Sequence, residues 1–377
     1  MFKAEELFQN ITDKNHPDET VLTIIQGKGT LPREQAGRNI HYDDASLSNY
    51  KKVEQGDFII HLRSFEGGLE MANEAGIVSP AYTILRCKRP HSSLFYDAYF
   101  HTDEFINHNL SKSVEGIRDG RQISYEAFKW LGIPYCEPTE QEKISNLFAA
   151  LNERIAKQRD LIEALKKYKR GLVSQILKQR LAISHEDNEW KEVCLSDVAE
   201  GFEYGLNAAA TAYDGKHKYI RITDIDDDTH TYINQDPVSP SGAFEERYRV
   251  RENDILFART GASVGKSYLY RKNDGDLFFA GFLIRIHVKE GVDGEYVFLN
   301  TLTEEYDKWV LLESARSGQP GINAEQYRKY RFKLPSLNTQ RRIATIARNI
   351  DVQIQKEALH LRLLQKQKVG LLQQLFI

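Results

Sequence analysis

One stretch of this chain occurs twice, and the repeat most constrains what the chain can fold into. Residues 141–177 align without a gap to residues 340–376, 199 positions later, and ten of the 37 aligned pairs are identical. Apolar residues recur in both copies at alternating steps of four and three, the spacing of a helix that packs lengthwise along another helix. Neither copy contains proline, and each contains one glycine. We therefore expect two long helices that pair with each other.

The seam between the two helices follows from this spacing. Gln158 and Glu357 interrupt the apolar steps at equivalent places, as do Lys169 and Lys368, and the steps of the second copy continue to Leu375. In an antiparallel pair with pseudo-two-fold symmetry, Gln158 would face Lys368 and Lys169 would face Glu357. Alternatively, these side chains extend to solvent at the edge of the seam. The expected interface comprises Ile144, Phe148, Leu151, Ile155, Gln158, Ile162, Leu165, Lys169, Ile343, Ile350, Ile354, Glu357, Leu361, Leu364 and Lys368.

Both copies also carry a glycine at the same place, Gly171 and Gly370. A glycine within a helix costs about 0.5–1 kcal/mol relative to alanine. Its presence in both copies suggests that another backbone approaches closely there, either the partner helix or a separate protein.

Composition narrows the class of protein. A chain of 377 residues suits two or three domains. Its three cysteines are far apart with no histidine at ligand spacing, which predicts neither a zinc site nor a disulfide framework and fits a reducing cytoplasm. The most apolar run, residues 277–286, is far short of the roughly 20 residues that span a bilayer. The net charge of −3 argues mildly against binding nucleic acid by bulk charge alone.

The repeats divide the rest of the chain into two blocks of mixed α/β character. Neither block shows the regular alternation of a nucleotide-binding sheet, so the fold class is α+β. Two similar helices that carry two dissimilar blocks are typical of a spacer that holds two separate reading domains apart. The expected division is a first block at 1–138, a helix at 139–183, a linker at 184–189, a second block at 190–336 and a second helix at 337–377.

Five segments carry a family resemblance: LPSLNTQRRIATIARNID at 334–351, its weaker partner IPYCEPTEQEKISNLFAALNERI at 133–155, YIRITDID at 219–226, NDILFARTGASVGKS at 253–267 and QGDFIIHLRSFEGGLE at 55–70. They resemble the specificity subunits of type I restriction–modification systems, and the resemblance covers essentially the whole chain. One departure is that the first block begins abruptly, without a clear counterpart to WKEVCLSDV at 190–198.

The resemblance implies two target-recognition domains, each followed by a conserved helix, with the helices packed as an antiparallel coiled coil. It also implies a non-catalytic subunit that reads double-stranded DNA in the major groove and docks methyltransferase (modification) subunits and restriction subunits. This chain would bind no cofactor or metal. S-adenosylmethionine, ATP and magnesium would be bound by the partner subunits.

The segment at 258–267 superficially resembles a phosphate-binding loop. Such a loop needs four residues between its glycine and the Gly-Lys pair, whereas Gly261 and Gly265 leave three, and no helix is expected to follow. A hairpin fits better, either purely structural or with its turn offered to DNA. Arginine can pair bidentately with guanine, and lysine and serine suit phosphates or base edges. The candidate DNA-binding residues here are Arg259, Thr260, Ser263 and Lys266.

Two other strands offer candidate DNA contacts. His61, Arg63 and Ser64 occupy the corresponding place in the first block, and the adjacent Phe65 would contact a thymine methyl group or pack locally. Tyr219, Arg221 and Thr223 alternate along a strand, which predicts one shared face toward DNA.

Together these features predict a non-catalytic DNA-specificity subunit that recognises a bipartite target. Because the two blocks differ, its two half-sites should differ. If both blocks face one side of the duplex, the half-site centres should lie about 10 bp apart. The alternative is a coiled-coil scaffold that assembles other proteins without reading DNA. A complete restriction–modification enzyme would need catalytic motifs, such as the Asn/Asp-Pro-Pro-aromatic motif of adenine methyltransferases, that the sequence lacks.

Overall fold

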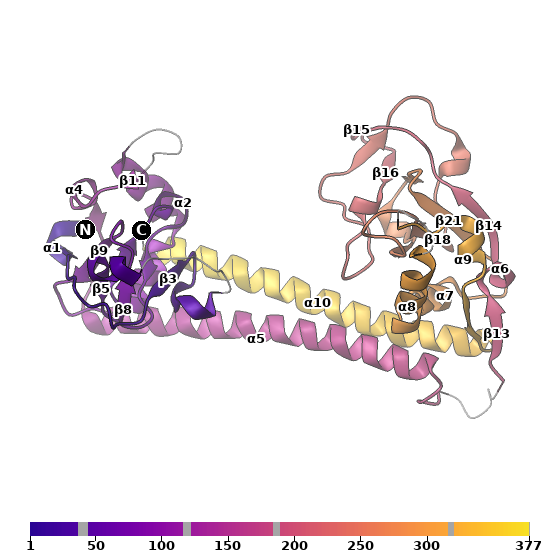
Figure 1. Ribbon diagram of the computed structural model, residues 1–377, viewed down its shortest axis with the longest axis horizontal. Coiled ribbons are helices and arrows are strands. Elements are labelled where there is room, and N and C mark those ends of the chain that lie inside the picture. The colour runs from indigo at the N-terminus through magenta and orange to yellow at the C-terminus, as the bar shows by residue number, and fades with distance from the viewer. Residues whose placement is uncertain (37–43, 116–121, 184–188, 316–319, 377) are drawn as a thin grey trace. The chain divides into compact units, whose positions relative to one another are not determined.

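The computed structural model describes residues 1–36, 44–115, 122–183, 189–315 and 320–376 (Figure 1). The chain divides into two compact units, and both long helices contribute to each of them. Unit 1 comprises residues 1–160 and 358–377, and unit 2 comprises residues 161–357. The linker expected at 184–189 lies, except for Glu189, outside the described residues.

Unit 1 is built from short strands and helices around one four-stranded antiparallel sheet. The sheet has the strand order β2-β9-β6-β7, and four two-stranded ladders, β1–β12, β3–β4, β5–β8 and β10–β11, surround it. Its helices are α1 (Ala4–Leu7), α2 (Ser64–Gly67), α3 (Ser93–Phe100), α4 (Tyr125–Phe128) and the start of α5 (Pro138–Leu177). Its strands are β1 (Phe2–Lys3), β2 (Phe8–Ile11), β3 (Leu22–Ile25), β4 (Gly29–Pro32), β5 (Lys51–Val53), β6 (Phe58–Ile60), β7 (Glu70–Met71), β8 (Gly76–Val78), β9 (Thr83–Cys87), β10 (Val114–Glu115), β11 (Gln122–Ile123) and β12 (Gly132–Ile133).

An aromatic cluster forms the core of unit 1. The rings of Phe8, Phe58, Tyr96 and Phe100 lie with centroids 4.9 to 6.3 Å apart, so the four-stranded sheet packs against α3. Phe376 joins this core from the end of the chain, with its ring 5.1 Å from that of Phe95. Aromatic pairs at these separations add to the free energy of burial, so the C-terminal turn is an integral part of unit 1.

Unit 2 contains the same kind of sheet. Strands β14, β21, β18 and β19 form a four-stranded antiparallel sheet in that order, with ladders β13–β22, β15–β17 and the parallel pair β16–β20. Its helices are α6 (Leu195–Val198), α7 (Gly294–Asn300), α8 (Glu304–Ser314), α9 (Ala324–Arg328) and the start of α10 (Leu337–Leu375). Its strands are β13 (Lys191–Cys194), β14 (Ala199–Tyr204), β15 (Ala210–Ala212), β16 (Lys218–Ile220), β17 (Val238–Pro240), β18 (Asp254–Ala258), β19 (Ser267–Leu269), β20 (Leu277–Phe279), β21 (Leu283–Val288) and β22 (Arg331–Leu334).

The two units share one topology although their sequences differ. In each, a first short strand pairs with the strand that precedes the long helix, a single helical turn follows, and the next strand edges the four-stranded sheet. In both, the helical turn is closed by a backbone N–H that donates to a carboxylate three residues later: Lys3 to Glu6 at 3.0 Å, and Cys194 to Asp197 at 2.8 Å. The segment from β1 to β2 is therefore the counterpart of residues 190–198, and the expectation that unit 1 lacks one was wrong. The two segments are therefore alike in their hydrogen bonds and not in their amino-acid residues.

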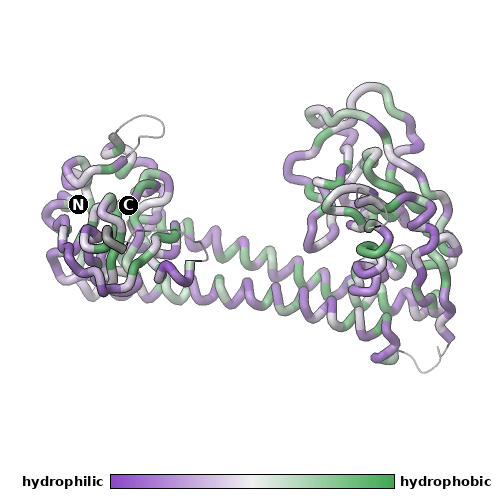
Figure 2. The backbone as a smooth tube through the Cα atoms, viewed as in Figure 1, coloured by the Kyte–Doolittle hydropathy of each residue, from purple (hydrophilic) through white to green (hydrophobic). Residues whose placement is uncertain are grey.

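Both expected long helices form, but α5 ends at Leu177, six residues before the expected end at Ile183. Hydropathy alternates along both helices (Figure 2). Within unit 1, the Phe148 ring stacks at 6.3 Å on that of Phe376, and Arg154 lies 3.4 Å from the His360 ring. In this unit the start of α5 thus runs antiparallel to the end of α10. Within unit 2, Val173 and Ile176 share a core cluster with Ile343 and Ala347, again in antiparallel order.

The residues expected at the helix interface are all buried or half-buried, but two details were wrong. Lys169 forms its ion pair with Asp351, at 2.6 Å, and not with Glu357. Asp351 precedes Glu357 along α10 and lies nearer to Ala347, which belongs to the unit 2 core. The stripe also ends differently, because Leu375 is exposed and Phe376 is buried in its place.

Lys368 interacts electrostatically with Asp97, and its expected contact with Gln158 stays a prediction. The glycines differ from expectation. A Cβ atom built on Gly171 or Gly370 meets, outside the backbone of its own helix turn, no atom of the described residues within 4 Å. Close approach of the partner helix at these glycines is therefore wrong.

A buried glutamine ties each long helix to its own unit. Gln141 accepts a hydrogen bond from the Ser92 backbone N–H at 3.0 Å and donates to the Cys136 carbonyl at 2.7 Å. Gln340, its repeat equivalent, accepts from the Asp293 N–H at 2.9 Å and donates to the Pro335 carbonyl at 2.8 Å. Both bond sets join the first turn of a long helix to the start of a core helix, so this identical pair marks a shared structural joint.

Candidate nucleic-acid interface

The segment at 258–267 is the turn of a hairpin between β18 and β19, as expected. Gly261 and Gly265 both have positive φ angles. A side chain on Gly265 would meet Val310 at 2.5 Å, so this position requires glycine. The turn leads into a strand and not into a helix, which excludes the phosphate-loop geometry.

Arg259 is the candidate that the hairpin presents best. Its guanidinium lies 5.0 Å from the centre of the Tyr204 ring, and this cation–π contact restricts the orientation of the guanidinium. The Nε atom is buried and has no hydrogen-bond partner. Thr260, next in sequence, is half-buried and forms a β-bridge with Gly321. The site therefore combines an immobilised arginine with an unused donor.

Lys266 is not available to DNA. Its side chain is only 9% exposed, forms an ion pair with Asp227, and donates to the Ile225 carbonyl at 3.0 Å. Strand β19 begins directly after Lys266, and the ammonium group of Lys266 lies against the loop that contains Ile225 and Asp227. Ser263 is half-buried, and its carbonyl accepts from the Lys266 N–H at 3.0 Å. The prediction that Lys266 is offered to DNA is wrong, and Ser263 has a turn-closing role.

The expectation of one shared face for Tyr219, Arg221 and Thr223 is also wrong. Strand β16 ends at Ile220, and residues 222–224 form a 3₁₀ turn, so the three side chains do not alternate along one strand. Tyr219 is buried, and its hydroxyl donates to the Leu206 carbonyl at 2.6 Å. Arg221 closes the turn by two side-chain hydrogen bonds of 2.8 Å to Asp224. Only Thr223 is exposed.

The candidate DNA-binding residues of unit 1 also differ in exposure. Arg63 is exposed. Ser64 is fully buried, where its hydroxyl accepts the His61 backbone N–H at 2.9 Å, so its expected contact with DNA is wrong. His61 is half-buried, with an unpartnered Nε2 atom. Phe65 packs against the unit 1 core, as its local-packing alternative proposed.

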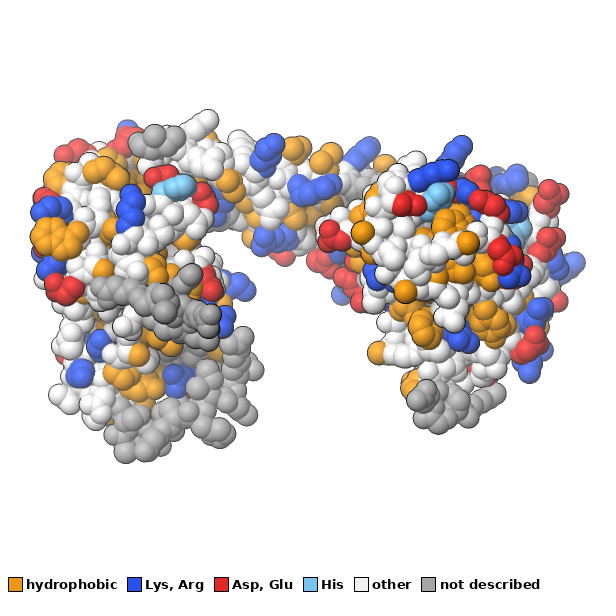
Figure 3. Space-filling model, turned by 90° about the horizontal axis from the view of Figure 1, so that it is seen from above, with side chains coloured by type: hydrophobic (Ala, Val, Ile, Leu, Met, Phe, Trp, Pro, Cys, Tyr) orange, Lys and Arg blue, Asp and Glu red, His pale blue; other side chains and the backbone are white. Residues whose placement is uncertain are grey.

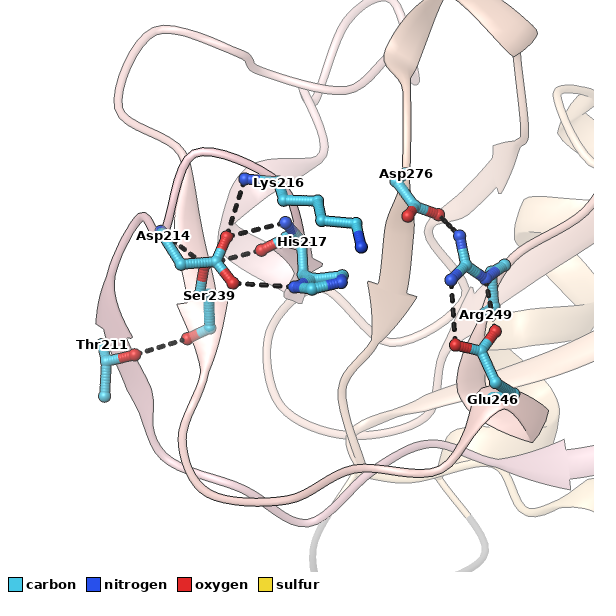
Figure 4. Close-up of polar contacts among 8 residues, drawn as sticks. All are labelled: Thr211, Asp214, Lys216, His217, Ser239, Glu246, Arg249 and Asp276. Atoms are coloured by element: carbon cyan, nitrogen blue, oxygen red, sulfur yellow. Dashed lines mark hydrogen bonds and ion pairs between the residues drawn. The ribbon is translucent and has the colours of Figure 1, made fainter.

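A basic turn between β15 and β16 was missed by the sequence reasoning (Figure 4). Asp214 accepts the His217 and Lys216 backbone N–H groups at 2.7 and 2.8 Å and the His217 ring at 2.7 Å. These bonds, from the His217 backbone above all, lower the pKa of the Asp214 carboxyl. The turn presents Lys216 as an exposed cation. An Asp-Gly pair followed by basic residues is a turn signal that sequence reasoning had available.

A second polar cluster in the same part of unit 2 carries its charges in internal pairs. Arg249 bonds to both oxygens of Glu246, at 2.6 and 2.9 Å, and also pairs with Asp276 (Figure 4). Its guanidinium is thus neutralised within the unit. Figure 3 shows Lys and Arg side chains interspersed with Asp and Glu over the visible face of unit 2, without one continuous basic patch.

In the part of the chain that the structure describes, no group of three or more His, Cys, Asp or Glu side chains is placed to hold a metal ion. None of the helices among those residues is both long and apolar enough to cross a membrane.

Comparison with known proteins supplies the context for this geometry. Residues 187–362 match the family model described as the type I restriction modification DNA specificity domain. No curated protein matches the chain.

Solved structures match along the whole chain. One comes from work on complex assembly and conformational transition of the type I R-M system, with TM-score 0.62, 18% identity, and coverage of 100% of this chain and 96% of that one. The HsdS subunit from Thermoanaerobacter tengcongensis matches with TM-score 0.51, 17% identity, and coverage of 100% and 95%. The type I S subunit from M. genitalium matches with TM-score 0.55, 14% identity, and coverage of 100% and 95%.

The domain match includes the hairpin with Arg259 and the basic turn with Lys216, and the structural likeness extends the same fold to unit 1. Residues 187–362 therefore match the type I restriction modification DNA specificity domain, and the fold along the chain is similar to that of the solved HsdS and S subunits.

Proposed function

We propose that the whole chain is a DNA-specificity subunit with two target-recognition domains that read a bipartite, asymmetric target. One observation carries the proposal: both units present the same four-stranded sheet, but the positions after its third strand hold different residues, His61 in one and Arg259 in the other. Two sheets of the same topology that carry different residues after the third strand suit two half-sites of different sequence. In this proposal the paired helices, as an antiparallel coiled coil with pseudo-two-fold symmetry, set the spacing.

The chemistry would be divided between this chain and its partners. This chain would supply recognition without catalysis. Methyltransferase subunits, docked on the long helices, would bring S-adenosylmethionine, and restriction subunits would bring ATP and magnesium. Beyond its own helix turn, a Cβ atom at Gly171 or Gly370 would have no atom of the described residues within 4 Å, which leaves room there for a partner's backbone.

Methylation mapping tests this proposal. The chain is co-expressed with its neighbouring methyltransferase subunit, and modified bases are mapped over the host DNA. The expected result is a gapped, two-part motif that appears only when both proteins are present. A motif with one half missing would restrict reading to one unit. A stable complex that modifies no motif would favour the scaffold alternative.

Charge reversal separates a DNA reader from a scaffold. Arg63→Glu and Arg259→Glu should abolish modification of the target while leaving the complex with the methyltransferase intact, as judged by co-purification. A scaffold would retain both assembly and partner activity.

A further inference from the structure

The two sheets place His61 and Arg259 at the same point of the fold. In unit 1, the last pair of the β6–β9 ladder joins Ile60 to Thr83; in unit 2, the last pair of the β18–β21 ladder joins Ala258 to Leu283. His61 and Arg259 are therefore the first residues beyond the same strand. By the same count, the residues that directly precede the partner strands are Tyr82 and Phe282.

Each of these two positions holds a buried N–H with no acceptor. The Nε2 atom of His61 and the Nε atom of Arg259 are two of the very few buried side-chain polar atoms without a hydrogen-bond partner in the described chain. The Arg63 backbone N–H donates to the His61 Nδ1 at 3.3 Å, which requires the hydrogen of a neutral ring to be on Nε2. Leaving a buried donor unsatisfied is unfavourable, so an unpartnered donor at both equivalent positions favours an acceptor supplied by a ligand, which the side chains that cover the donor must move to admit.

Each donor also has an aromatic neighbour. The His61 and Tyr82 rings lie edge to face, with centroids 6.5 Å apart. The Arg259 N–H donates to the Phe282 carbonyl at 3.1 Å, which fixes the two residues side by side. Phe282 is 60% exposed although it is fully apolar. An exposed phenylalanine beside an unsatisfied donor is unfavourable in the free protein and suits a ligand that offers both an acceptor and an apolar face.

We propose that His61 with Tyr82, and Arg259 with Phe282, are matched base-contact pairs, one in each unit. In each, the N–H donates to an acceptor on a base edge, and the aromatic ring packs against the same or an adjacent base, such as a thymine methyl group. This assignment rests on the proposed function and deepens it by naming the residues that distinguish one base from another.

A base fits these pairs better than a phosphate. Phosphate contacts in proteins draw mainly on positive charge. Burial lowers the pKa of His61, and nearby His101 and Arg63 oppose its protonation while Glu70 favours it only in part, so the ring is neutral at pH 7. The two positions thus share a donor and an aromatic ring but not a charge. That shared chemistry matches a base edge, which presents acceptors and apolar surface together.

The test uses the full chain in the co-expressed methyltransferase complex and reads the methylated motif base by base. Arg259→Lys keeps the charge but removes the planar fork, and Phe282→Ala removes the ring. Each should reduce the preference for the favoured base about tenfold at one position, or at adjacent positions, of one half-site. His61→Ala and Tyr82→Leu should do the same in the other half-site only. Arg331→Ala and Trp130→Ala, which remove an exposed arginine and an exposed aromatic ring elsewhere, should leave the motif unchanged.

Three outcomes would overturn the inference. Variants that leave every base preference unchanged would show that these residues do not read bases. Variants that lower modification of all sites equally, with an unchanged motif, would indicate a phosphate contact or loss of folding. Failure of the wild-type complex to modify any gapped motif would instead refute the proposed function, and the inference with it.

Discussion

At the scale of single residues, a buried carboxylate in unit 1 is held by three donors. Glu70 accepts the Gly27 and Gly29 backbone N–H groups at 2.6 and 2.9 Å, and the His101 ring at 3.3 Å. Burial alone would raise the pKa of Glu70, but these hydrogen bonds outweigh it and lower the pKa. Burial would likewise lower the pKa of His101, but Glu70 and Asp97 raise it above the usual 6.5. The pair ties the β3–β4 hairpin to α3.

The raised pKa of His101 predicts a pH-dependent stability of unit 1. The stabilisation from protonated His101 is fully present below pH 6.5, its usual pKa, and is lost as the pH rises through its folded pKa. The difference in thermal unfolding midpoint between wild type and His101→Asn should therefore shrink as the pH rises above 6.5. Because His101 helps to lower the pKa of His61, the double variant with His61→Ala in both backgrounds separates the two rings. A difference that stays constant over this range would contradict the assignment.

Residue-level reading of the sequence succeeded where exposure depends on local structure and failed where it depends on tertiary contacts. Arg63 and the hairpin around Gly261 are placed as the sequence indicates, because turn chemistry is local. Lys266 and Tyr219 lie on strand-like segments, yet loops from elsewhere in the chain bind their polar ends: Lys266 pairs with Asp227, and the Tyr219 hydroxyl donates to the Leu206 carbonyl. Nothing in their neighbours along the sequence reports those loops.

At the scale of elements, the duplicated glutamines are the joints between long helices and their units. Gln340→Ala should lower the free energy of unfolding of unit 2 by about 1–3 kcal/mol, because the Asp293 N–H and the Pro335 carbonyl lose their buried partner. Denaturant unfolding measures this loss. Gln175→Ala is the matched control in the same unit, since Gln175 is also identical between the repeats but is exposed, and it should change stability little. Equal effects of the two substitutions on stability would show that the hydrogen bonds of Gln340 do not stabilise the attachment of α10 to unit 2.

The ion pair on the long helices offers a second test at this scale. Lys169 and Asp351 are partly buried and meet at 2.6 Å, so a double-mutant cycle with Lys169→Met and Asp351→Asn should give a coupling of about 0.5–1 kcal/mol. The same cycle with Glu357→Gln in place of Asp351→Asn should give a coupling near zero. Larger coupling to Glu357 would restore the pairing that the repeat symmetry suggested.

The apolar period located both helices and their buried faces because packing along a helix depends on spacing alone. It could not select Asp351 over Glu357, because spacing along one helix does not fix the register in which the facing helix packs.

At the scale of the whole molecule, the repeat is larger than the sequence shows. Only the helices retain visible identity, yet the units that precede them share strand order, the closing ladder and the buried glutamine joint. The two four-stranded sheets have the same hydrogen-bond topology, but the residues that follow their third strands differ. This is expected if packing constrains the sheets and the residues that follow the strands read different DNA sequences. Comparison of residues alone therefore found no counterpart in the first unit to the beginning of the second.

Charge balance predicts how strongly the chain binds DNA by itself. The 51 basic and 54 acidic residues leave a net charge of −3, and Lys266, Arg221 and Arg249 are neutralised by internal pairs. Affinity for DNA falls with salt by a slope of about −0.9 for each phosphate contacted, so the net negative charge and the internal pairing of these three cations favour weak binding and a shallow slope.

We therefore expect the isolated chain to bind its mapped target weakly at physiological salt, and the methyltransferase complex to bind more tightly with a steeper salt dependence. Fluorescence anisotropy with a labelled duplex over a series of salt concentrations measures both quantities, and a duplex with scrambled half-sites is the control. If the affinity and its salt dependence are the same with and without the partner, this chain makes all of the DNA contacts. The basic residues of the turn at Lys216 and the exposed Arg63 would then have to supply these contacts, and their substitution would reduce the slope.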